Sequence, residues 1–211
     1  MAEKDAMQKK LLLGVIAVLV VIGAIYFVNN SNSGSSTSST SSQPAKTTSA
    51  KAKTPGRDEF IKGRALSKEK KFKDALDMYI QAAEKGHPAA MNYAGMYLCN
   101  GYGDIQKDVS KGIDYLTKAA EAGYAAAQLN LGRAYMNPRY GLKRDLDKGL
   151  KYFMAAAEKN NADAMLYMGY NYEVGRGVKK DKEKALEWYD KAVKAGNKAA
   201  AKRAENLRKQ Q

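Results

Sequence analysis

The sequence predicts an all-α protein in which pairs of helices stack into a solenoid. Similar segments that begin with alanine recur every 37 residues, at Ala90, Ala127 and Ala164, and the next equivalent alanine, Ala200, follows after 36 residues. A unit of this length is one helix–turn–helix pair, which cannot bury its apolar face alone and therefore stacks on its neighbours. Residues 57–211 contain no run with the alternating period of a strand, so we expect no β-sheet there.

The spacing of apolar residues predicts the individual helices. In the segment that ends at Gly86, the side chains of Leu76, Tyr79, Ile80 and Ala83 follow the i, i+3, i+4, i+7 pattern of one helix face. The glycine is a typical helix stop. Alanines beside these positions allow neighbouring helices to approach closely. The tyrosines that we expect to fill the space between repeats are Tyr79, Tyr115, Tyr152 and Tyr189.

The repeated positions resemble the Sel-one-like repeat family, a longer relative of the tetratricopeptide repeat. In the segments that begin at Ala90, Ala127 and Ala164, a glycine follows the first alanine after five residues, and a lysine opens the second helix. The resemblance implies three Sel-one-like repeats. The match over residues 164–196 comprises Ala164, Gly169, Tyr172, Gly175, Gly177, Val178, Asp181, Lys184, Ala185, Trp188, Tyr189, Lys191, Ala192 and Gly196.

The two ends of the repeat domain depart from this pattern. Matching positions of the first and second helix are 12 residues apart in the first repeat but 16 or 17 apart in the others. Residues 57–88 therefore resemble a tetratricopeptide-type opening repeat with a short turn. Residues 197–209 have apolar side chains on one face and charges on the other, as expected of the capping helix that such stacks require. The predicted repeat domain covers residues 57–211.

An uncharged segment, residues 11–28, precedes the repeats. As a helix it spans about 27 Å, enough for a transmembrane anchor. A cleaved signal peptide is the alternative, but its apolar core is usually shorter and ends at small residues. Lys9 and Lys10 precede the segment, and the next positive charge is Lys46. The positive-inside rule then places residues 1–10 in the cytoplasm and the repeat domain outside the inner (plasma) membrane.

Residues 29–56 are rich in serine and threonine and continue into a Lys/Ala/Thr/Pro stretch. Such a composition cannot bury enough apolar surface to offset the entropy of ordering, so we expect a disordered tether.

Charge and residue usage limit the classes of function. Residues 61–211 carry 29 Lys or Arg against 18 Asp or Glu, a net charge of +11, which favours acidic proteins, anionic lipids or anionic polymers as partners. Cys99 and His87 are the only cysteine and histidine, so the chain forms no intrachain disulfide and no Cys/His zinc site. The acids at residues 145, 147, 181 and 183 lie beside lysines at helix starts, where they favour the helix dipole. We therefore predict no enzyme, cofactor or metal site.

The resemblance implies that the first helix of each repeat lines a concave groove. Positions three before, one after and four after the family glycine are expected to point into it, although packing between helices is the alternative for the same side chains. Arginines, a tyrosine and methionines there suit an acidic protein or peptide. The predicted groove residues are Arg64, Asn92, Met96, Arg133, Met136, Tyr170 and Glu173.

A basic stretch near the C-terminus is a second candidate surface, with a solvated face as the alternative interpretation. Its residues are Arg176, Lys179, Lys180, Lys198, Lys202 and Arg203.

Together these features predict a non-enzymatic, membrane-anchored adaptor or scaffold that binds a protein or peptide partner and organises a complex of the cell envelope. The alternative is a basic domain that binds an anionic envelope polymer or lipid surface. A domain outside the cytoplasm would not meet nucleic acid, so none is predicted as a partner.

Overall fold

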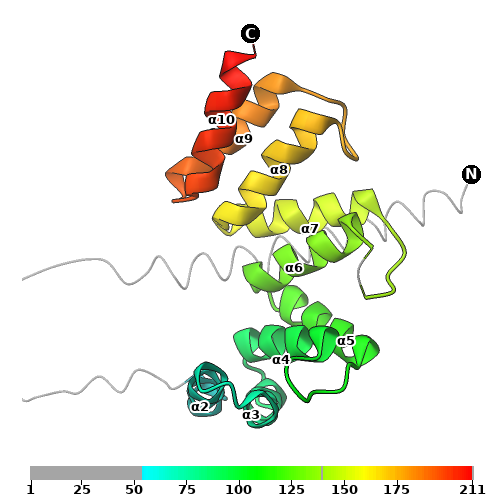
Figure 1. Ribbon diagram of the computed structural model, residues 1–211, viewed down its shortest axis with the longest axis vertical. Helices are drawn as coiled ribbons and strands as arrows, with labels where there is room; N and C mark the ends of the chain where they lie inside the picture. Colours follow the sequence, from blue (N-terminus) through cyan, green and yellow to red (C-terminus); the bar gives the residue numbers. More distant parts are fainter. Residues whose placement is uncertain (1–53, 139, 211) are drawn as a thin grey trace, which may run out of the picture. The chain divides into compact units, whose positions relative to one another are not determined.

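The computed structural model describes residues 54–138 and 140–210, and these residues form α-helices joined by turns and loops, with no strand among them (Figure 1). The helices are α2 (Arg57–Lys68), α3 (Phe72–Glu84), α4 (Pro88–Asn100), α5 (Val109–Glu121), α6 (Ala125–Met136), α7 (Leu146–Glu158), α8 (Ala162–Val174), α9 (Lys182–Lys194) and α10 (Lys198–Lys209).

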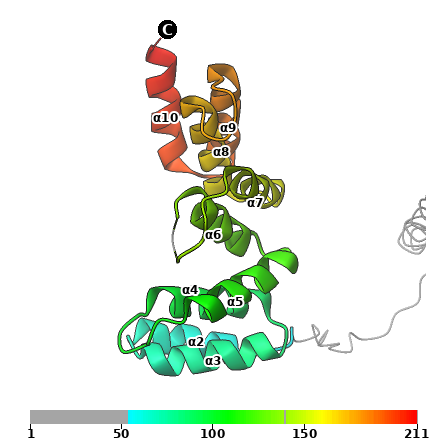
Figure 2. The ribbon, with the colours of Figure 1, turned by 90° about the vertical axis from the view of Figure 1, so that its right-hand side faces the viewer.

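The helices form four pairs, which we number as repeats one to four: α2–α3, α4–α5, α6–α7 and α8–α9. Each helix packs on its neighbours along the chain, and α10 packs on α9 after the last pair. Figures 1 and 2 both show the pairs following one another from α2 and α3 to α10. The prediction of an all-α solenoid is confirmed for the part of the chain that the structure describes.

Most of the later helices begin at a residue whose side chain caps the helix. Asp108, Asp145 and Asp181 each accept a hydrogen bond from the backbone N–H three residues later, at the starts of α5, α7 and α9. Asn161 and Asn197 do the same for α8 and α10. These bonds satisfy amides that have no partner within the helix. The acids that the sequence places at helix starts therefore have a structural role.

The family glycine in the first helix of a repeat makes room for a large side chain from the second helix. A Cβ atom added to Gly132 would lie 2.5 Å from the Phe153 ring, and one added to Gly169 would lie 2.5 Å from the Tyr189 ring. Both rings are buried. Glycine at this position is therefore required by close packing within the repeat.

The four tyrosines predicted to fill the space between repeats take up two different positions. The side chains that cover the family glycine are Tyr79, Leu116, Phe153 and Tyr189. The tyrosines Tyr115 and Tyr152 lie one residue earlier in the sequence and are only half-buried. A shift of one residue turns a side chain by about 100° around a helix, so these two rings lie at the edge of the core. There Tyr115 packs against the cluster that contains Ala83 of α3, and Tyr152 against the cluster that contains Ala120 of α5, between repeats as predicted.

The connections between paired helices differ in length as expected. Only residues 69–71 separate α2 from α3, whereas the other pairs are joined by residues 101–108, 137–145 and 175–181. The longer loops fold back on the preceding repeat. The Tyr140 hydroxyl donates to Asn100 Oδ1 (3.0 Å), and Arg176 Nη2 donates to Asn137 Oδ1 (2.8 Å). The loops therefore fasten successive repeats together.

The predicted anchor, residues 11–28, and the preceding residues 1–10 lie outside the described residues, as does all but the end of the predicted tether, residues 29–56. Within residues 54–138 and 140–210, no helix has the length and apolar character needed to cross a membrane.

Candidate partner-binding surface

The first helices of the repeats form a surface that polar contacts hold together. Asn130 Nδ2 on α6 donates to Asn92 Oδ1 on α4 (3.0 Å), and the Tyr97 hydroxyl on α4 donates to Ser67 Oγ on α2 (2.5 Å). Further along, the guanidinium of Arg133 on α6 lies 5.7 Å from the ring centroid of Tyr167 on α8. We call the side formed by α2, α4, α6, α8 and α10 the first-helix surface.

A cavity of about 480 Å³ lies on this surface between α2, α4 and α6. Ring–ring contacts build one wall: the Tyr102 ring lies 4.9 Å from that of Tyr97 and 6.1 Å from that of Phe72. Tyr102 remains 39% exposed, so an aromatic ring is available at the rim. The residues that line the cavity are Ser67, Phe72, Asn92, Tyr93, Met96, Tyr97, Tyr102 and Asn130.

Two predicted groove residues line this cavity, and one does not reach the surface. Asn92 and the half-buried Met96 are part of its wall. Met136 is 2% exposed, and its side chain lies against Gly149 of the paired helix. It therefore belongs to the core of its repeat, because the position four residues after the family glycine faces the second helix there.

The predicted residues near the C-terminal end gather in a second group. The Arg203 guanidinium lies 4.9 Å from the ring centroid of Tyr170 and 3.4 Å from Glu173 Oε2. Glu173 also accepts a hydrogen bond from the Tyr189 hydroxyl. The pKa of Tyr189 is raised above its ordinary value, mainly by burial and secondly by this hydrogen bond. Two predicted groove residues and one residue of the predicted basic surface thus meet between α8 and α10.

The remaining predicted residues are dispersed. Arg64 is exposed on α2 beside Ile61, and Arg133 is half-buried on α6. In the predicted basic surface, Arg176 is turned inward, since its Nη2 donates to the Met136 carbonyl as well as to Asn137. Four exposed lysines form no ion pair with another described residue. They are Lys179, Lys180, Lys198 and Lys202.

Sequence reasoning missed most of the aromatic wall. Tyr102 lies between two glycines, Gly101 and Gly103, and this pattern indicated only a turn. In the structure both glycines have positive φ (65° and 59°), and a Cβ on Gly103 would lie 2.7 Å from the Phe72 ring. The loop can approach Phe72 because this position lacks a side chain, and Tyr102 is carried onto the cavity with it.

No catalytic or metal-binding arrangement emerges among the described residues. They contain no group of three His, Cys, Asp or Glu side chains placed to hold a metal ion. Cys99 is buried, and burial raises the pKa of its thiol to about 11. Since the thiolate is the reactive form, this cysteine is a poor nucleophile at neutral pH.

Known structures share the fold. A Sel1 repeat protein from Oxalobacter formigenes is 32% identical over 69% of this chain and 59% of its own, with a TM-score of 0.63. A protective antigen of uropathogenic Escherichia coli strains, described as displaying an SLR fold, is 31% identical over 70% of this chain and 32% of its own, with a TM-score of 0.62. This chain thus spans less than two thirds of either relative. Cysteine rich protein B of Helicobacter pylori is 30% identical over 61% of this chain and 94% of its own (TM-score 0.49).

No curated protein matches the sequence. The Sel1 repeat family model matches residues 63–87, 88–124, 125–161 and 162–197, which together exceed half of the chain. The first match shows that the opening repeat, despite its short turn, belongs with the other three and is not a separate tetratricopeptide unit. With four consecutive matches over the helix pairs of the solenoid, the chain belongs to the Sel1 repeat family.

Proposed function

We propose that this protein is a non-enzymatic, membrane-anchored adaptor that binds a protein or peptide partner through its first-helix surface. Sel1 repeat proteins are in general protein-interaction scaffolds. Residues 11–28 would anchor the chain in the inner membrane, residues 29–56 would tether it, and the repeat domain would organise a cell-envelope complex outside the cytoplasm.

The observation that carries this proposal is the cavity between α2, α4 and α6. Its aromatic wall offers apolar surface to an inserted side chain, and rigid aromatic residues are favoured anchors at interfaces. The amides of Asn92 and Asn130 can hydrogen-bond to the backbone of an extended segment beside that anchor. Arg64 and Arg133 lie on the neighbouring first helices and favour acidic residues in the same partner.

Photo-crosslinking in cells tests the binding surface. A photoreactive residue at Met96 of the full chain is expected to capture one dominant protein. Tyr102→Ala should abolish that adduct, because it removes the exposed ring at the rim of the cavity. Val193→Ala is the matched control: Val193 is also 39% exposed but lies on α9, away from the cavity. An adduct that survives Tyr102→Ala, or disappears equally with Val193→Ala, contradicts the proposal.

A separate experiment tests the anchor and the orientation. The full chain should sediment with membranes and should be released into the soluble fraction when residues 11–28 are deleted. A C-terminal reporter enzyme that is active only outside the cytoplasm should be active in the intact chain. Activity of a cytoplasmic reporter at the same position would show that the orientation is wrong.

The alternative function is binding of an anionic envelope polymer or lipid surface by the basic domain. Exposed Lys179, Lys180, Lys198 and Lys202, with no ion-pair partner among the described residues, favour it. Binding to vesicles that contain anionic lipid should then weaken by about tenfold or more as salt shortens the screening length from about 10 Å to a few Å. If a partner instead inserts a side chain into the aromatic cavity, its affinity should change little over the same range of salt concentration.

A further inference from the structure

The cavity on the first-helix surface contains a buried hydrogen-bond donor that no described residue uses. Asn92 is only 6% exposed; its Oδ1 accepts from Asn130 Nδ2 (3.0 Å), whereas its Nδ2 donates to no described residue. This nitrogen is not enclosed by the protein, and Asn92 lines the cavity, so a ligand there can reach it. Buried N–H groups normally have an acceptor. The free donor therefore indicates a ligand that supplies one.

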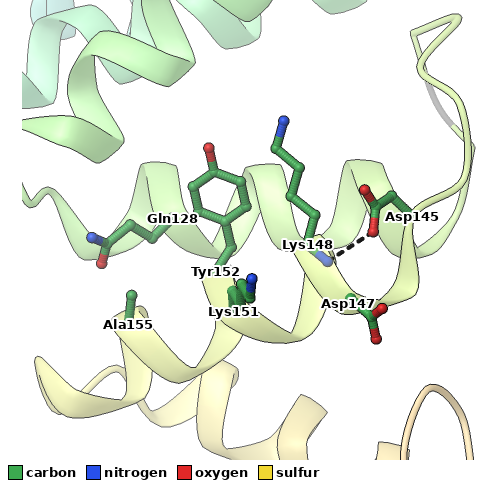
Figure 3. Close-up of a pocket in the computed structure, with 7 residues that line it drawn as sticks. All are labelled: Gln128, Asp145, Asp147, Lys148, Lys151, Tyr152 and Ala155. Carbon is green, nitrogen blue, oxygen red and sulfur yellow. Dashed lines mark hydrogen bonds between the residues drawn. The ribbon is translucent and has the colours of Figure 1, made fainter. Parts of the chain in front are cut away.

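A second cavity, of about 600 Å³ along α7, differs in this respect (Figure 3). Its one amide, Gln128, donates to the Ala120 carbonyl of α5 (3.1 Å), and its Oε1 is enclosed by the protein, where a ligand cannot reach it. The other polar residues of its lining are two acids, two lysines and Tyr152. That cavity therefore does not select a ligand, whereas the cavity on the first-helix surface does.

The repeat itself does not need an asparagine at the position of Asn92. Three residues before the family glycine, the next two repeats hold Leu129 and Leu166. Leu129 is 8% exposed and belongs to the core cluster that contains Phe153. An apolar side chain is therefore compatible with the stack at this position, and Asn92 gives the second repeat a polar group that packing does not require.

The loops within the repeats explain a second polar group of the cavity. The Tyr140 hydroxyl donates to Asn100 Oδ1 (3.0 Å), and Arg176 Nη2 donates to Asn137 Oδ1 (2.8 Å). Tyr140 and Arg176 each precede a loop glycine, and each asparagine lies five residues after the family glycine of the previous repeat. In both loops, the residue before the glycine thus binds a side-chain amide at the end of the preceding first helix.

Tyr102 occupies the same place in the first long loop but has no such amide to bind. It precedes Gly103, and the residue five after the family glycine of the previous repeat is Lys68. The Tyr102 hydroxyl forms no hydrogen bond with a described residue, and the ring is 39% exposed at the rim of the cavity. The place that an asparagine amide takes in the two later loops is therefore open to a ligand here.

The lining makes the cavity selective for an uncharged group. None of the described residues that line it is Asp, Glu, Lys, Arg or His. A charged group that entered would lose its water without gaining an opposite charge. A primary amide fits the lining, because its oxygen accepts from Asn92 Nδ2 and the Tyr102 hydroxyl and its NH2 group donates to Asn130 Oδ1. The aromatic wall contacts the methylene groups of the same side chain.

We propose that the partner inserts the side chain of an asparagine or glutamine into this cavity, which presupposes the proposed function, that the first-helix surface binds a protein or peptide. A side chain is the group that reaches Asn92, because an inserted backbone brings further N–H and C=O groups that need partners at the same depth. The acidic residues of the partner then lie outside the cavity, beside Arg64 and Arg133.

Peptide selection tests the proposal, with the full chain in detergent micelles as the target. Peptides enriched from a phage-displayed library of random seven-residue sequences are synthesised and assayed by fluorescence polarisation. The expected class loses affinity in Tyr102→Ala and contains one Asn or Gln that binding requires. Replacing that residue by Leu, or by the matching acid, should weaken binding by about tenfold or more. The leucine leaves the Asn92 donor unpaired, and the acid brings a charge into an uncharged cavity.

Two variants show whether the cavity reads the amide. Asn92→Leu installs the residue of the next two repeats, so Tm should change little, and the preference for the amide peptide over its Leu version should largely disappear. Tyr102→Phe keeps the ring and should reduce the same preference by about threefold. Asn206→Leu makes the matched change at an exposed position of α10 and should keep the full preference. If Asn92→Leu lowers Tm, Tyr102→Phe decides.

The outcomes separate this proposal from the proposed function. Peptides that lose affinity in Tyr102→Ala but tolerate Leu at every Asn or Gln overturn the amide proposal while supporting the proposed function. A preference for the amide that persists unchanged in both Asn92→Leu and Tyr102→Phe does the same. If no enriched peptide loses affinity in Tyr102→Ala, the cavity binds no peptide segment, and the proposed function fails together with the amide proposal.

Discussion

The first and last repeats bury a tyrosine at the same position, but its hydroxyl group meets different surroundings. Tyr79 and Tyr189 both have 0% exposure, and each covers the family glycine of its repeat. The Tyr79 hydroxyl is buried without a hydrogen bond of normal geometry to a described residue, whereas the Tyr189 hydroxyl donates to Glu173. The repeat therefore requires the ring, and neighbouring residues decide what happens to the hydroxyl.

The same contrast extends to the packing around each tyrosine. The Tyr79 ring lies 5.1 Å from the ring of Tyr93 and 5.3 Å from that of Tyr97, inside an aromatic cluster. Burial raises the pKa of Tyr79 to about 12. Around Tyr189 the neighbours are charged, with Glu173 and Arg203 beside it. The ring of Tyr79 therefore lies among other aromatic rings, whereas Tyr189 lies beside an ion pair.

Replacing either buried ring should have the largest effect. Tyr79→Ala and Tyr189→Ala are each expected to lower the free energy of unfolding by about 3–5 kcal/mol, the usual cost of removing a buried aromatic side chain. Urea unfolding followed by circular dichroism measures the change. Tyr102→Ala, which removes an exposed ring, should cost far less. A small loss for Tyr79→Ala alone would mean that the two rings are not equivalent.

Removing only the hydroxyl should separate the two positions. Tyr189→Phe is expected to cost about 1–2 kcal/mol, because Glu173 loses its donor. Tyr79→Phe should be neutral or stabilising, since it removes a buried hydroxyl that makes no hydrogen bond of normal geometry with a described residue. Paired urea titrations of the two variants provide the measurement. Equal losses would contradict the difference in surroundings.

The ion pair at the C-terminal end should contribute little. Arg203→Ala is expected to cost no more than about 1 kcal/mol, because the Arg203 and Glu173 side chains are 46% and 27% exposed and their attraction is screened. The difference from the unaltered chain should shrink further in high salt. Thermal unfolding at low and high salt measures it, and a salt-independent loss would instead point to stacking on Tyr170.

The smallest effect concerns pH. His87 Nδ1 accepts from the Ala90 backbone N–H (3.3 Å) as the N-cap of α4, and burial lowers its pKa below 6.5. The unfolded chain then binds the proton more readily, so stability present above about pH 6.5 is lost as pH falls toward the folded pKa. His87→Asn copies the caps Asn161 and Asn197 and should remove this dependence. Unfolding titrations on both sides of pH 6.5 test the difference.

Much of the fold could be predicted from local pattern. The apolar spacing, the aspartates at helix starts and the short first turn all correspond to features of the structure, because each depends on residues close together in the chain. The candidate site could be predicted only in part. Asn92 and Met96 were placed by their offset from Gly95, but the same offset rule placed Met136, which is buried. The position four residues after the family glycine packs against the second helix of the repeat, as Cys99 does against Gly112 and Met136 against Gly149, so the rule wrongly assigned Met136 to the groove.

The sequence by itself determined the repeat, its helices and the glycines that face large side chains, because a 37-residue period repeats the same local interactions. Only the tertiary structure decided which side chains from different repeats meet. Ser67, Asn92 and Asn130 line one cavity although 25 and 38 residues separate them along the chain. Gln128 lines another cavity, and its buried Oε1 has no hydrogen-bond partner among the described residues. Such meetings depend on how each helix pair is rotated against the next, and the periodic pattern does not specify that rotation.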